Sequence, residues 1–417
     1  MTLTTITDAD LPLQRAYRWE KERASQVFLT QPMGRGQPLR EYTWAQTMDE
    51  ARRVAAWLKA QGWEPGSRVA IMSKNTAWWM MADLAIWMAG YVSVPIYPNL
   101  VAESVIPILE HSDTRIVFVG KLDDWKAMMP GIPPGIPTIG TPLCEAPTTY
   151  HWDQIVASTE PMKESPTFAS DAMATIIYTS GTTGMPKGAV HGFDSFAHSA
   201  KALVQVLNST PEDRALSYLP LAHVAERCLI EGQALYAGFH LYFADSLDTF
   251  VADLQRARPT FFFSVPRLWV KFQQGVLSKM PAEKLDRLLK IPLLRGIVKK
   301  KILGALGLDQ CRFAAGGAAP MPPELLGWYA RLGLPIIEVY GMTENCGVSH
   351  ATLPGVQRPG TVGLPYEGVQ SRLDPANGEI QVKSPGLMLG YYKEEALTRQ
   401  TFTPDGWLHT GDKGQLE

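Results

Sequence analysis

Along the first part of the chain, stretches with apolar residues at helical spacing alternate with short apolar runs. A helix is predicted between Thr43 and Gly62, where apolar residues recur at helical spacing behind two candidate capping boxes, Thr43 with Gln46 and Thr47 with Glu50. Short apolar runs at 68–72, 91–95 and 114–119 predict strands, and the stretches near 76–89 and 102–111 predict helices between them. Strands that alternate with helices indicate a parallel, doubly wound sheet.

The same alternation continues later in the chain and then changes character. After a predicted helix at 191–207, apolar runs at 214–218, 241–243, 260–266, 310–315 and 335–340 predict a second α/β sheet. Beyond Pro354 short runs stand between glycines, and Asn377-Gly378 predicts a hairpin before the alternating strand 379–383. The pattern predicts an α/β fold with two doubly wound, mostly parallel sheets and a small β-barrel-like subdomain.

We therefore predict that the chain is divided into segments 1–165, 166–349 and 350–417. Residues 129–149 are rich in Pro and Gly and show no periodicity, so we expect a surface connection there, either at a subdomain boundary or within one domain. The apolar stretch 78–97 contains Asp83 and breaks at Gly90, which favours a buried helix followed by a strand over a membrane span.

Composition adds limits on function. A chain of 417 residues with 46% hydrophobic residues is long enough for two or three cores. Its net charge of −2 argues against a nucleic-acid partner, which normally requires a basic excess. The four cysteines form no Cys-x-x-Cys pair, and the first 15 residues lack the apolar core of a signal peptide, so we expect a reduced, cytoplasmic protein without structural zinc.

A candidate phosphate-binding loop follows the apolar run 174–177. Residues 178–188 read Tyr-Thr-Ser-Gly-Thr-Thr-Gly-Met-Pro-Lys-Gly. Glycines let backbone N–H groups approach phosphate oxygens, hydroxyls add donors, and Lys187 adds positive charge. The Walker pattern does not fit this loop. A flexible linker of the same composition is the structural alternative.

The order of residues in this loop resembles the phosphate loop of the adenylate-forming, AMP-binding enzymes, which include acyl- and aryl-CoA synthetases, luciferases and peptide-synthetase adenylation domains. Two further motifs of that family occur in the family's order, Tyr340-Gly341-Met342-Thr343-Glu344 and the stretch Gly-Trp-Leu-His-Thr-Gly-Asp at 406–412. The resemblance extends from about Tyr42 to the last residue.

The resemblance implies a site for ATP and Mg²⁺, with coenzyme A as co-substrate. The loop would hold the β- and γ-phosphates, Thr179 and Glu344 would bind magnesium through hard oxygen ligands, and Thr343 would donate to the α-phosphate. Tyr340 would lie against adenine, and Asp412 would accept from the ribose hydroxyls. A core tyrosine and a turn aspartate are the structural alternatives. The implied ATP-binding residues are Thr179, Ser180, Gly181, Thr182, Thr183, Gly184, Lys187, Gly316, Gly317, Ala318, Glu338, Tyr340, Gly341, Met342, Thr343 and Asp412.

The stretch 217–227 resembles the version found in long-chain fatty acyl-CoA synthetases, where its histidine lies near the acyl carboxylate. By that resemblance Tyr218, His223 and Val224 would bind the acid, and His223 would join Lys187, Thr343 and Glu344 as a catalytic group. A structural histidine is the alternative. Residues 265–269, Val-Pro-Arg-Leu-Trp, also resemble the long-chain branch. Glu226-Arg227 is interpreted as a local ion pair without a chemical role.

A basic amphipathic helix is predicted over 290–308. It could rest on an anionic membrane, which would place the protein peripherally at the inner face, but we favour a solvated helix that covers the second sheet.

Full-length members of the resembled family continue into a mobile C-terminal domain that carries a catalytic lysine and the surface that admits CoA. We therefore interpret the chain as a shortened form of a larger protein. The predicted activity is that of a long-chain fatty acid–CoA ligase that forms acyl-AMP. The alternatives are a fatty acyl-AMP ligase, a ligase for medium-chain or aromatic acids, and a catalytically silent module that binds nucleotide or fatty acid. Oligomeric state is left open.

Overall fold

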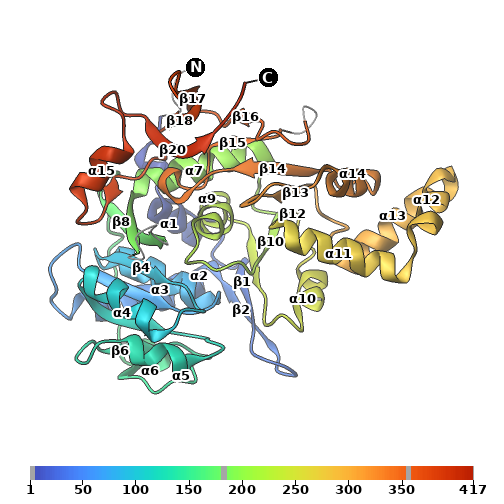
Figure 1. The fold of residues 1–417 in the computed structure, drawn as a ribbon. Coiled ribbons are helices and arrows are strands. Elements are labelled where there is room, and N and C mark those ends of the chain that lie inside the picture. Colours follow the sequence, from blue (N-terminus) through green and yellow to red (C-terminus); the bar gives the residue numbers. More distant parts are fainter. Residues whose placement is uncertain (1–4, 180–185, 354–357, 417) are drawn as a thin grey trace.

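The computed structural model describes residues 5–179, 186–353 and 358–416 of the chain. Figure 1 shows layered sheets and helices, with one helical arm extending from the body. The helices are η1 Asp8–Asp10, α1 Pro12–Glu22, α2 Trp44–Lys59, α3 Ala77–Met88, α4 Ala102–His111, α5 Trp125–Met128, η2 Met129–Gly131, α6 Trp152–Ser158, α7 Phe193–Leu207, α8 Val224–Glu226, η3 Arg227–Gly232, α9 Gln233–Ala237, α10 Phe250–Ala257, α11 Pro266–Lys279, α12 Ala282–Lys290, α13 Pro292–Leu306, α14 Pro323–Arg331, η4 Thr343–Asn345 and α15 Glu395–Thr401.

The described strands form four sheets. The largest has the order β19-β9-β8-β4-β3-β5-β6-β7, and its strands are β3 Arg68–Met72, β4 Val92–Ile96, β5 Thr114–Val119, β6 Thr138–Gly140, β7 Tyr150–His151, β8 Met173–Thr179, β9 Lys187–Gly192 and β19 Gly390–Tyr391. From β8 to β7 its neighbouring strands are parallel, whereas β9 pairs antiparallel with both β8 and β19.

The other three sheets are smaller. One has the order β10-β11-β1-β2, with β1 Val27–Pro32, β2 Leu39–Thr43, β10 Arg214–Ser217 and β11 His240–Phe243. The next contains β12 Phe261–Ser264, β13 Phe313–Gly316, β14 Ile336–Tyr340, β15 His350–Ala351 and β16 Leu364–Pro365 in that order. The last is antiparallel, with β17 Gln370–Leu373, β18 Glu379–Lys383 and β20 Leu408–Lys413.

The predicted α/β class is confirmed, and all the described sheets except the antiparallel sheet of β17, β18 and β20 are mixed. The expected second sheet is in fact two, because β10 and β11 pair with the N-terminal strands rather than with β12 to β14. The stretch 129–149 contains the short strand β6, which was not predicted because Pro and Gly interrupt the apolar pattern there. Sheet membership does not follow the boundaries at 165 and 349, since β8, β9 and β19 share one sheet with strands from the first segment. The three-part division of the chain stays a prediction.

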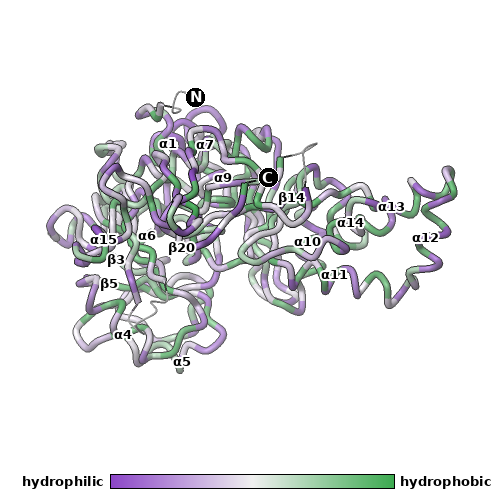
Figure 2. The backbone as a smooth tube through the Cα atoms, turned by 45° about the horizontal axis from the view of Figure 1, so that its top comes forward, coloured by the Kyte–Doolittle hydropathy of each residue, from purple (hydrophilic) through white to green (hydrophobic). Residues whose placement is uncertain are grey.

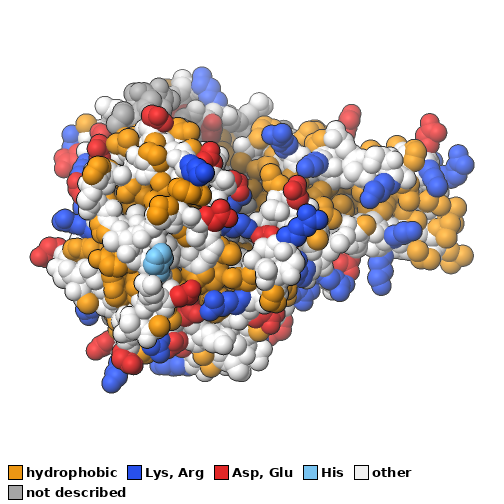
Figure 3. All heavy atoms as spheres, turned by 90° about the horizontal axis from the view of Figure 1, so that it is seen from below, with side chains coloured by type: hydrophobic (Ala, Val, Ile, Leu, Met, Phe, Trp, Pro, Cys, Tyr) orange, Lys and Arg blue, Asp and Glu red, His pale blue; other side chains and the backbone are white. Residues whose placement is uncertain are grey.

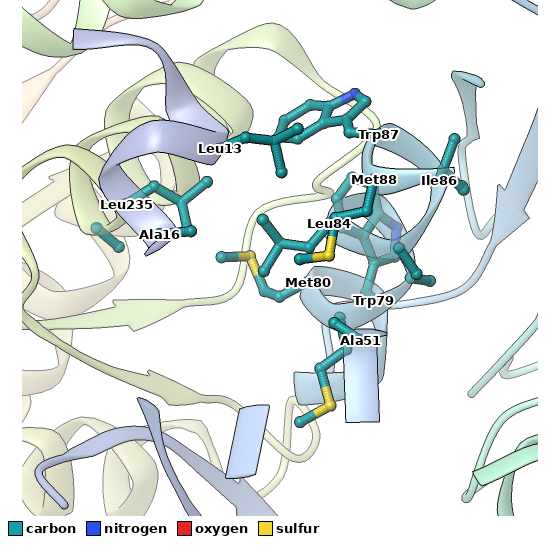
Figure 4. Packing of buried hydrophobic residues seen from close by; sticks show 14 of the residues in the cluster. Leu13, Ala16, Ala51, Trp79, Met80, Leu84, Ile86, Trp87, Met88 and Leu235 are labelled. Carbon is teal, nitrogen blue, oxygen red and sulfur yellow. The ribbon is translucent and has the colours of Figure 1, made fainter. Parts of the chain in front are cut away.

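The core centres on α3, in which every residue is buried. Its tryptophans and methionines pack against α1, α2 and α9, as Figure 4 shows for Trp87, Met80 and Leu84 near Leu13 and Leu235. An N-terminal capping box between Thr43 and Gln46 starts α2, in agreement with one of the two predicted boxes. In the described part of the chain, no helix combines the length and apolarity needed to cross a bilayer.

Candidate nucleotide site

A cavity of about 530 Å³ opens beyond the C-terminal ends of β13 and β14. Ligands of α/β sheets collect beyond the carboxyl ends of parallel strands, and these two strands are parallel. Six residues predicted from the sequence to bind ATP line this cavity, namely Gly316, Ala318, Glu338, Tyr340, Gly341 and Asp412. The structure therefore brings together residues from β13, β14 and β20, and the volume lies in the range usual for small-molecule sites.

Tyr340 and Asp412 meet at one wall of the cavity. The Tyr340 hydroxyl donates to Asp412 Oδ2 at 2.7 Å. Burial and the neighbouring carboxylate of Asp412 raise the pKa of Tyr340, so its phenol stays protonated and remains a donor. Asp412 lies on β20 and Tyr340 on β14, so this hydrogen bond joins two different sheets. The predicted adenine and ribose residues are thus direct neighbours.

In the turns after β13 and β14, other backbone lies too close to Gly317 and Gly341 for either to carry a side chain. A Cβ added at Gly317 would lie 2.9 Å from the Val339 carbonyl oxygen, and one added at Gly341 would collide with the backbone of Gly347. Ala318 has a φ of 63°, in the left-handed region. These constraints keep bare backbone at the cavity wall, which suits a flat base lying on it.

At the predicted phosphate end of the site, Tyr391 contacts both Glu344 and Lys187. Its hydroxyl donates to Glu344 Oε1 at 2.6 Å. The Lys187 ammonium lies 5.7 Å from the centre of the same ring. Thr179 pairs in register with Lys187 across β8 and β9, so Lys187 is next to both Thr179 and the Tyr391 ring. The other loop residues predicted to bind phosphate, 180–184, lie outside the described residues.

Tyr391 was not among the site residues predicted from the sequence. It lies on β19, which pairs antiparallel with β9 and places Tyr391 opposite Ala189. Burial and the Glu344 carboxylate raise its pKa, so the hydroxyl keeps its proton. A two-residue strand carries no periodic signal, so only the sheet pairing reveals its position.

A buried histidine supports the loop that carries Thr343 and Glu344. His191 on β9 is fully buried, and its Nε2 lies 2.8 Å from the Thr343 carbonyl oxygen. Burial lowers the pKa of His191 to about 4, so the ring is neutral and Nε2–H is the donor. Within the loop, the Met342 N–H donates to Asn345 Oδ1 at 2.9 Å. Strand β9 thereby fixes η4 to the phosphate end.

His223 stands at the N-terminus of α8. Its Nδ1 accepts from the Ala225 N–H at 3.1 Å, and burial lowers its pKa. The ring is therefore neutral with its proton on Nε2, which has no hydrogen-bond partner among the described residues. The neighbouring Val224 is buried and packs near Gly347, in the turn that follows η4. The predicted acid-binding and nucleotide motifs are thus adjacent through Val224.

The two thiols at this junction also touch. Cys228 and Cys346 are buried with their sulfurs 3.0 Å apart, although all four cysteines of the chain are free. Burial raises the pKa of the Cys228 thiol, which favours the protonated, unreactive form. This contact packs η3 directly against the segment after Glu344.

Glu226 anchors the segment that leads to His223. Its Oε1 accepts from Ser217 Oγ at 2.7 Å, from the Tyr218 N–H at 2.9 Å and from Asn75 Nδ2 at 3.2 Å. Asn75 Oδ1 in turn accepts from the Leu221 N–H at 3.0 Å. The interpretation of Glu226-Arg227 as a local ion pair is wrong, because α8 and η3 point the two side chains to different partners. Arg227 pairs instead with Asp83 and Glu231.

Tyr218 belongs to a second cavity. This cavity, of about 620 Å³, lies between α10, α11 and α13, and apolar residues dominate its walls. Tyr218 stacks on Phe262, and its hydroxyl donates to the Phe263 carbonyl at 2.9 Å. Leu268, from the Val-Pro-Arg-Leu-Trp motif, lines the same cavity, whereas His223 and Val224 do not. The predicted acid-binding residues are therefore divided between two places.

Within the described ranges, three or more His, Cys, Asp or Glu side chains nowhere gather as a metal cluster would require. A magnesium ion held through one carboxylate, one hydroxyl and substrate phosphates needs no such cluster. Thr179 and Glu344, joined through the surroundings of Tyr391, stay the predicted positions.

Comparison with known proteins identifies the family of this chain. The family model described as AMP-binding enzyme matches residues 15–392. The chain belongs to this family. It is 28% identical over 428 residues to the long-chain-fatty-acid–CoA ligase ACSBG2 of Rattus norvegicus, an alignment that covers 90% of the chain and 64% of that ligase. The chain thus spans less than two thirds of this relative's length.

Solved structures share the fold of the AMP-binding enzymes with this chain. ATP-bound MatB from Rhodopseudomonas palustris has a TM-score of 0.77 at 24% identity, covering 98% of this chain and 76% of MatB. The N-terminal domain of FACL13 from Mycobacterium tuberculosis has a TM-score of 0.78 at 22% identity, covering 98% and 97% of the two chains. At these identities the likeness establishes the fold.

Proposed function

We propose that this AMP-binding enzyme activates a long-chain fatty acid in two steps. In the first, a carboxylate oxygen attacks the α-phosphorus of ATP, acyl-AMP forms and pyrophosphate leaves. In the second, the thiol of CoA attacks the acyl carbon and AMP leaves. The observation that carries the proposal is the meeting of three distant motifs, with Tyr340 beside Asp412 at one end and Lys187 and Glu344 joined through Tyr391 at the other.

The residues present fit ATP. The glycine turns and the 530 Å³ cavity accommodate a nucleoside, with Tyr340 against the base and Asp412 accepting from the ribose. Lys187 offers positive charge to the phosphates, and Thr343 follows on the loop that His191 supports. Magnesium bound at Thr179 and Glu344 would offset phosphate charge. Together these groups reduce the repulsion between two approaching anions.

Two observations support a long-chain acid. The relative from Rattus norvegicus is named as a long-chain ligase, and an apolar cavity of about 620 Å³ lies beside the substrate stretch at Tyr218. The neutral His223 would donate from Nε2–H to the acyl carboxylate and orient it, while Glu226 holds the preceding segment. In the longer protein that the family implies, a C-terminal domain would complete CoA transfer.

The rivals differ in product and acid. A fatty acyl-AMP ligase would stop at the adenylate, and a ligase for medium-chain or aromatic acids would keep the same nucleotide site. A silent binding module would hold ATP without releasing pyrophosphate.

The test is pyrophosphate release with Mg-ATP and a panel of acetate, octanoate, palmitate and benzoate, with and without CoA, on the chain and on any longer protein that contains it. We expect release that rises with chain length and acyl-CoA as the product. Release highest with benzoate or acetate would overturn the long-chain assignment. ATP binding without release under any condition would favour the silent module.

A matched pair of variants tests the nucleotide site itself. Glu344→Ala should weaken Mg²⁺-dependent ATP binding by at least about tenfold, because the site loses its carboxylate ligand. The control Glu324→Ala removes an exposed carboxylate from α14 and should leave binding unchanged. Equal binding by the two variants would contradict the assigned site.

A further inference from the structure

The helices α12 and α13 form a hairpin that extends from the body, and this shape is visible in two views (Figures 1 and 2). Its base is packed, because Leu285, Ile302 and Leu306 are buried in one cluster with residues of α10, α11 and α14. Arg331 of α14 also pairs with Asp286 at 2.8 Å. The hairpin is thus attached firmly at one end and free at the other.

The free end is uncovered and mostly apolar. Residues 290–297 are eight consecutive exposed positions. Leu293 is 86% exposed and Ile297 66%, and Ile291 and Leu294 are exposed as well. The expectation that this helix covers a sheet is therefore wrong for its first two turns, which are exposed on every side. Exposed aliphatic side chains gathered at one point mark an interaction surface rather than an ordinary solvated face.

The hairpin is also strongly basic. Residues 282–306 contain seven Lys and Arg residues and two acidic residues. Arg295 and Lys300 are exposed and form no ion pair with any described residue. Figure 3 shows hydrophobic side chains and Lys or Arg side chains together on this arm. The tip carries four exposed aliphatic residues with Lys290 and Arg295 among them, and three lysines, 299–301, lie behind it. This arrangement matches the interface of an anionic bilayer, with acyl chains below and phosphate head groups above.

We propose that the hairpin tip, residues 290–297, inserts into the surface of an anionic lipid bilayer. Two helical turns span about 10 Å, which matches the shallow depth of interfacial insertion. Arg295 would extend its head group back to the phosphates, and Lys299, Lys300 and Lys301, about one turn further along α13, would lie at the head groups. The contact is peripheral and involves no spanning helix.

A second copy of the chain fits this surface less well. Stable protein interfaces use about 20 to 30 residues on each side, whereas the exposed tip has eight, 290–297. Two such hairpins would also bring like charges together. The cavity of about 620 Å³ is lined by Val298, Lys301 and Ile302, directly beyond the tip, so the apolar surface continues from tip to cavity. The proposal does not depend on the proposed reaction.

Co-sedimentation with vesicles tests it, using phosphatidylcholine alone and phosphatidylcholine mixed with phosphatidylglycerol. The wild-type chain should bind the mixed vesicles and release them as salt is raised. The tip variant Leu293→Ser with Ile297→Ser should bind about tenfold or more weakly. The charge variant Arg295→Gln with Lys300→Gln should lose about fivefold per charge.

Matched controls remove the same groups elsewhere. Val101→Ser with Leu364→Ser replaces two exposed aliphatic residues of the body, and Lys21→Gln with Lys59→Gln replaces two exposed lysines. Both should bind like the wild type. Circular dichroism spectra that match the wild type would establish that each variant is folded.

Two results would overturn the proposal. One is wild-type protein that stays in the supernatant with the mixed vesicles, or tip variants that bind them as well as the wild type. The other is a lipid-free dimer, seen by analytical ultracentrifugation, that the tip variant abolishes, since this would assign the tip to a second copy.

Discussion

At the scale of single residues, Tyr391 joins two parts of the candidate site that lie far apart in the chain. Its hydroxyl donates to Glu344 and its ring faces the ammonium of Lys187. A hydrogen bond to a carboxylate restrains the rotamer of the acid and fixes the lone pairs that remain for another ligand. Tyr391 is thus positioned to orient Glu344 rather than to bind substrate itself.

Tyr391→Phe should remove that orientation while retaining the ring. We expect Mg²⁺-dependent ATP binding to weaken roughly tenfold, because hydrogen bonds to charged groups are stronger than neutral ones. Isothermal titration calorimetry with and without Mg²⁺ measures the change. The control Tyr392→Phe alters the next residue, whose hydroxyl has no hydrogen-bond partner among the described residues, and should bind normally. Equal loss in both variants would contradict the role of Tyr391.

Glu226 is a second residue whose chemistry depends on its surroundings. Burial raises its pKa from 4.5 to about 8, although hydrogen bonds from Ser217 and the Tyr218 N–H favour the charged form. Between these pH values the folded chain keeps a proton that the unfolded chain has released. The free energy of unfolding contributed by Glu226 therefore falls as pH rises from about 4.5 to about 8.

Glu226→Gln should remove this pH dependence. Urea denaturation at about pH 5 and about pH 8 measures the free energy of unfolding of both proteins. Relative to the wild type, the variant should be more stable at the higher pH than at the lower one, by up to a few kcal/mol. Glu324→Gln, at an exposed position, should show no such gain. A constant difference between variant and wild type at both pH values would mean that Glu226 titrates normally.

At the scale of elements, a buried charge cluster fastens the π-helix η3 to α3. Arg227 Nη2 lies 2.7 Å from Asp83 Oδ2, and its Nε lies 3.0 Å from Glu231 Oε2. The guanidinium also lies 5.0 Å from the Trp79 ring. Burial raises the pKa of both carboxyl groups, and the charge of Arg227 opposes that rise. Because η3 follows α8 directly, this cluster also holds the helix that His223 begins.

Arg227→Met should destabilise the chain by about 3–5 kcal/mol, because two buried carboxyl groups lose their partner. The midpoint of urea denaturation measures this change. Arg399→Met removes the exposed partner of Glu395 and should cost less than about 1 kcal/mol. If both variants unfold alike, the buried cluster does not hold η3.

At the scale of the whole molecule, sheets join segments that are distant in sequence. Strand β19 of the C-terminal segment completes the largest sheet, and β20 brings Asp412 to Tyr340. The candidate site therefore exists only when β9, β14, β19 and β20 are assembled. A ligand that touches β9, β14 and β20 should stabilise the contact between these strands.

Hydrogen–deuterium exchange should detect this coupling. Mg-ATP should slow exchange in 187–192, 336–344 and 408–413 together, and leave α12 and α13 unaffected. Asp412→Asn should reduce the protection of 408–413, whereas Asp405→Asn, exposed in the same segment, should not. Protection confined to one of the three stretches would contradict a shared site.

Many elements of the fold and the family motifs could be predicted from local patterns in the sequence. Helix α4 and strands β3, β5 and β18 lie where the sequence predicts them. Helical spacing of apolar residues indicates a helix, and a short apolar run indicates a buried strand of a parallel sheet. The motifs at 178–188, 340–344 and 406–412 identify the family, since their order of glycine, hydroxyl and charged residues is specific.

Tertiary structure alone decided the rest. Strand pairing is set by contacts between distant residues, so the sequence does not reveal that β1 joins β11 or that Tyr391 reaches Glu344. Burial is also a property of the assembled chain. The spacing of apolar and basic residues in 290–308 fits a helix that is covered and one that is exposed. In the structure, Ile302 in the second half of α13 is buried, whereas Leu293 in the first half is exposed.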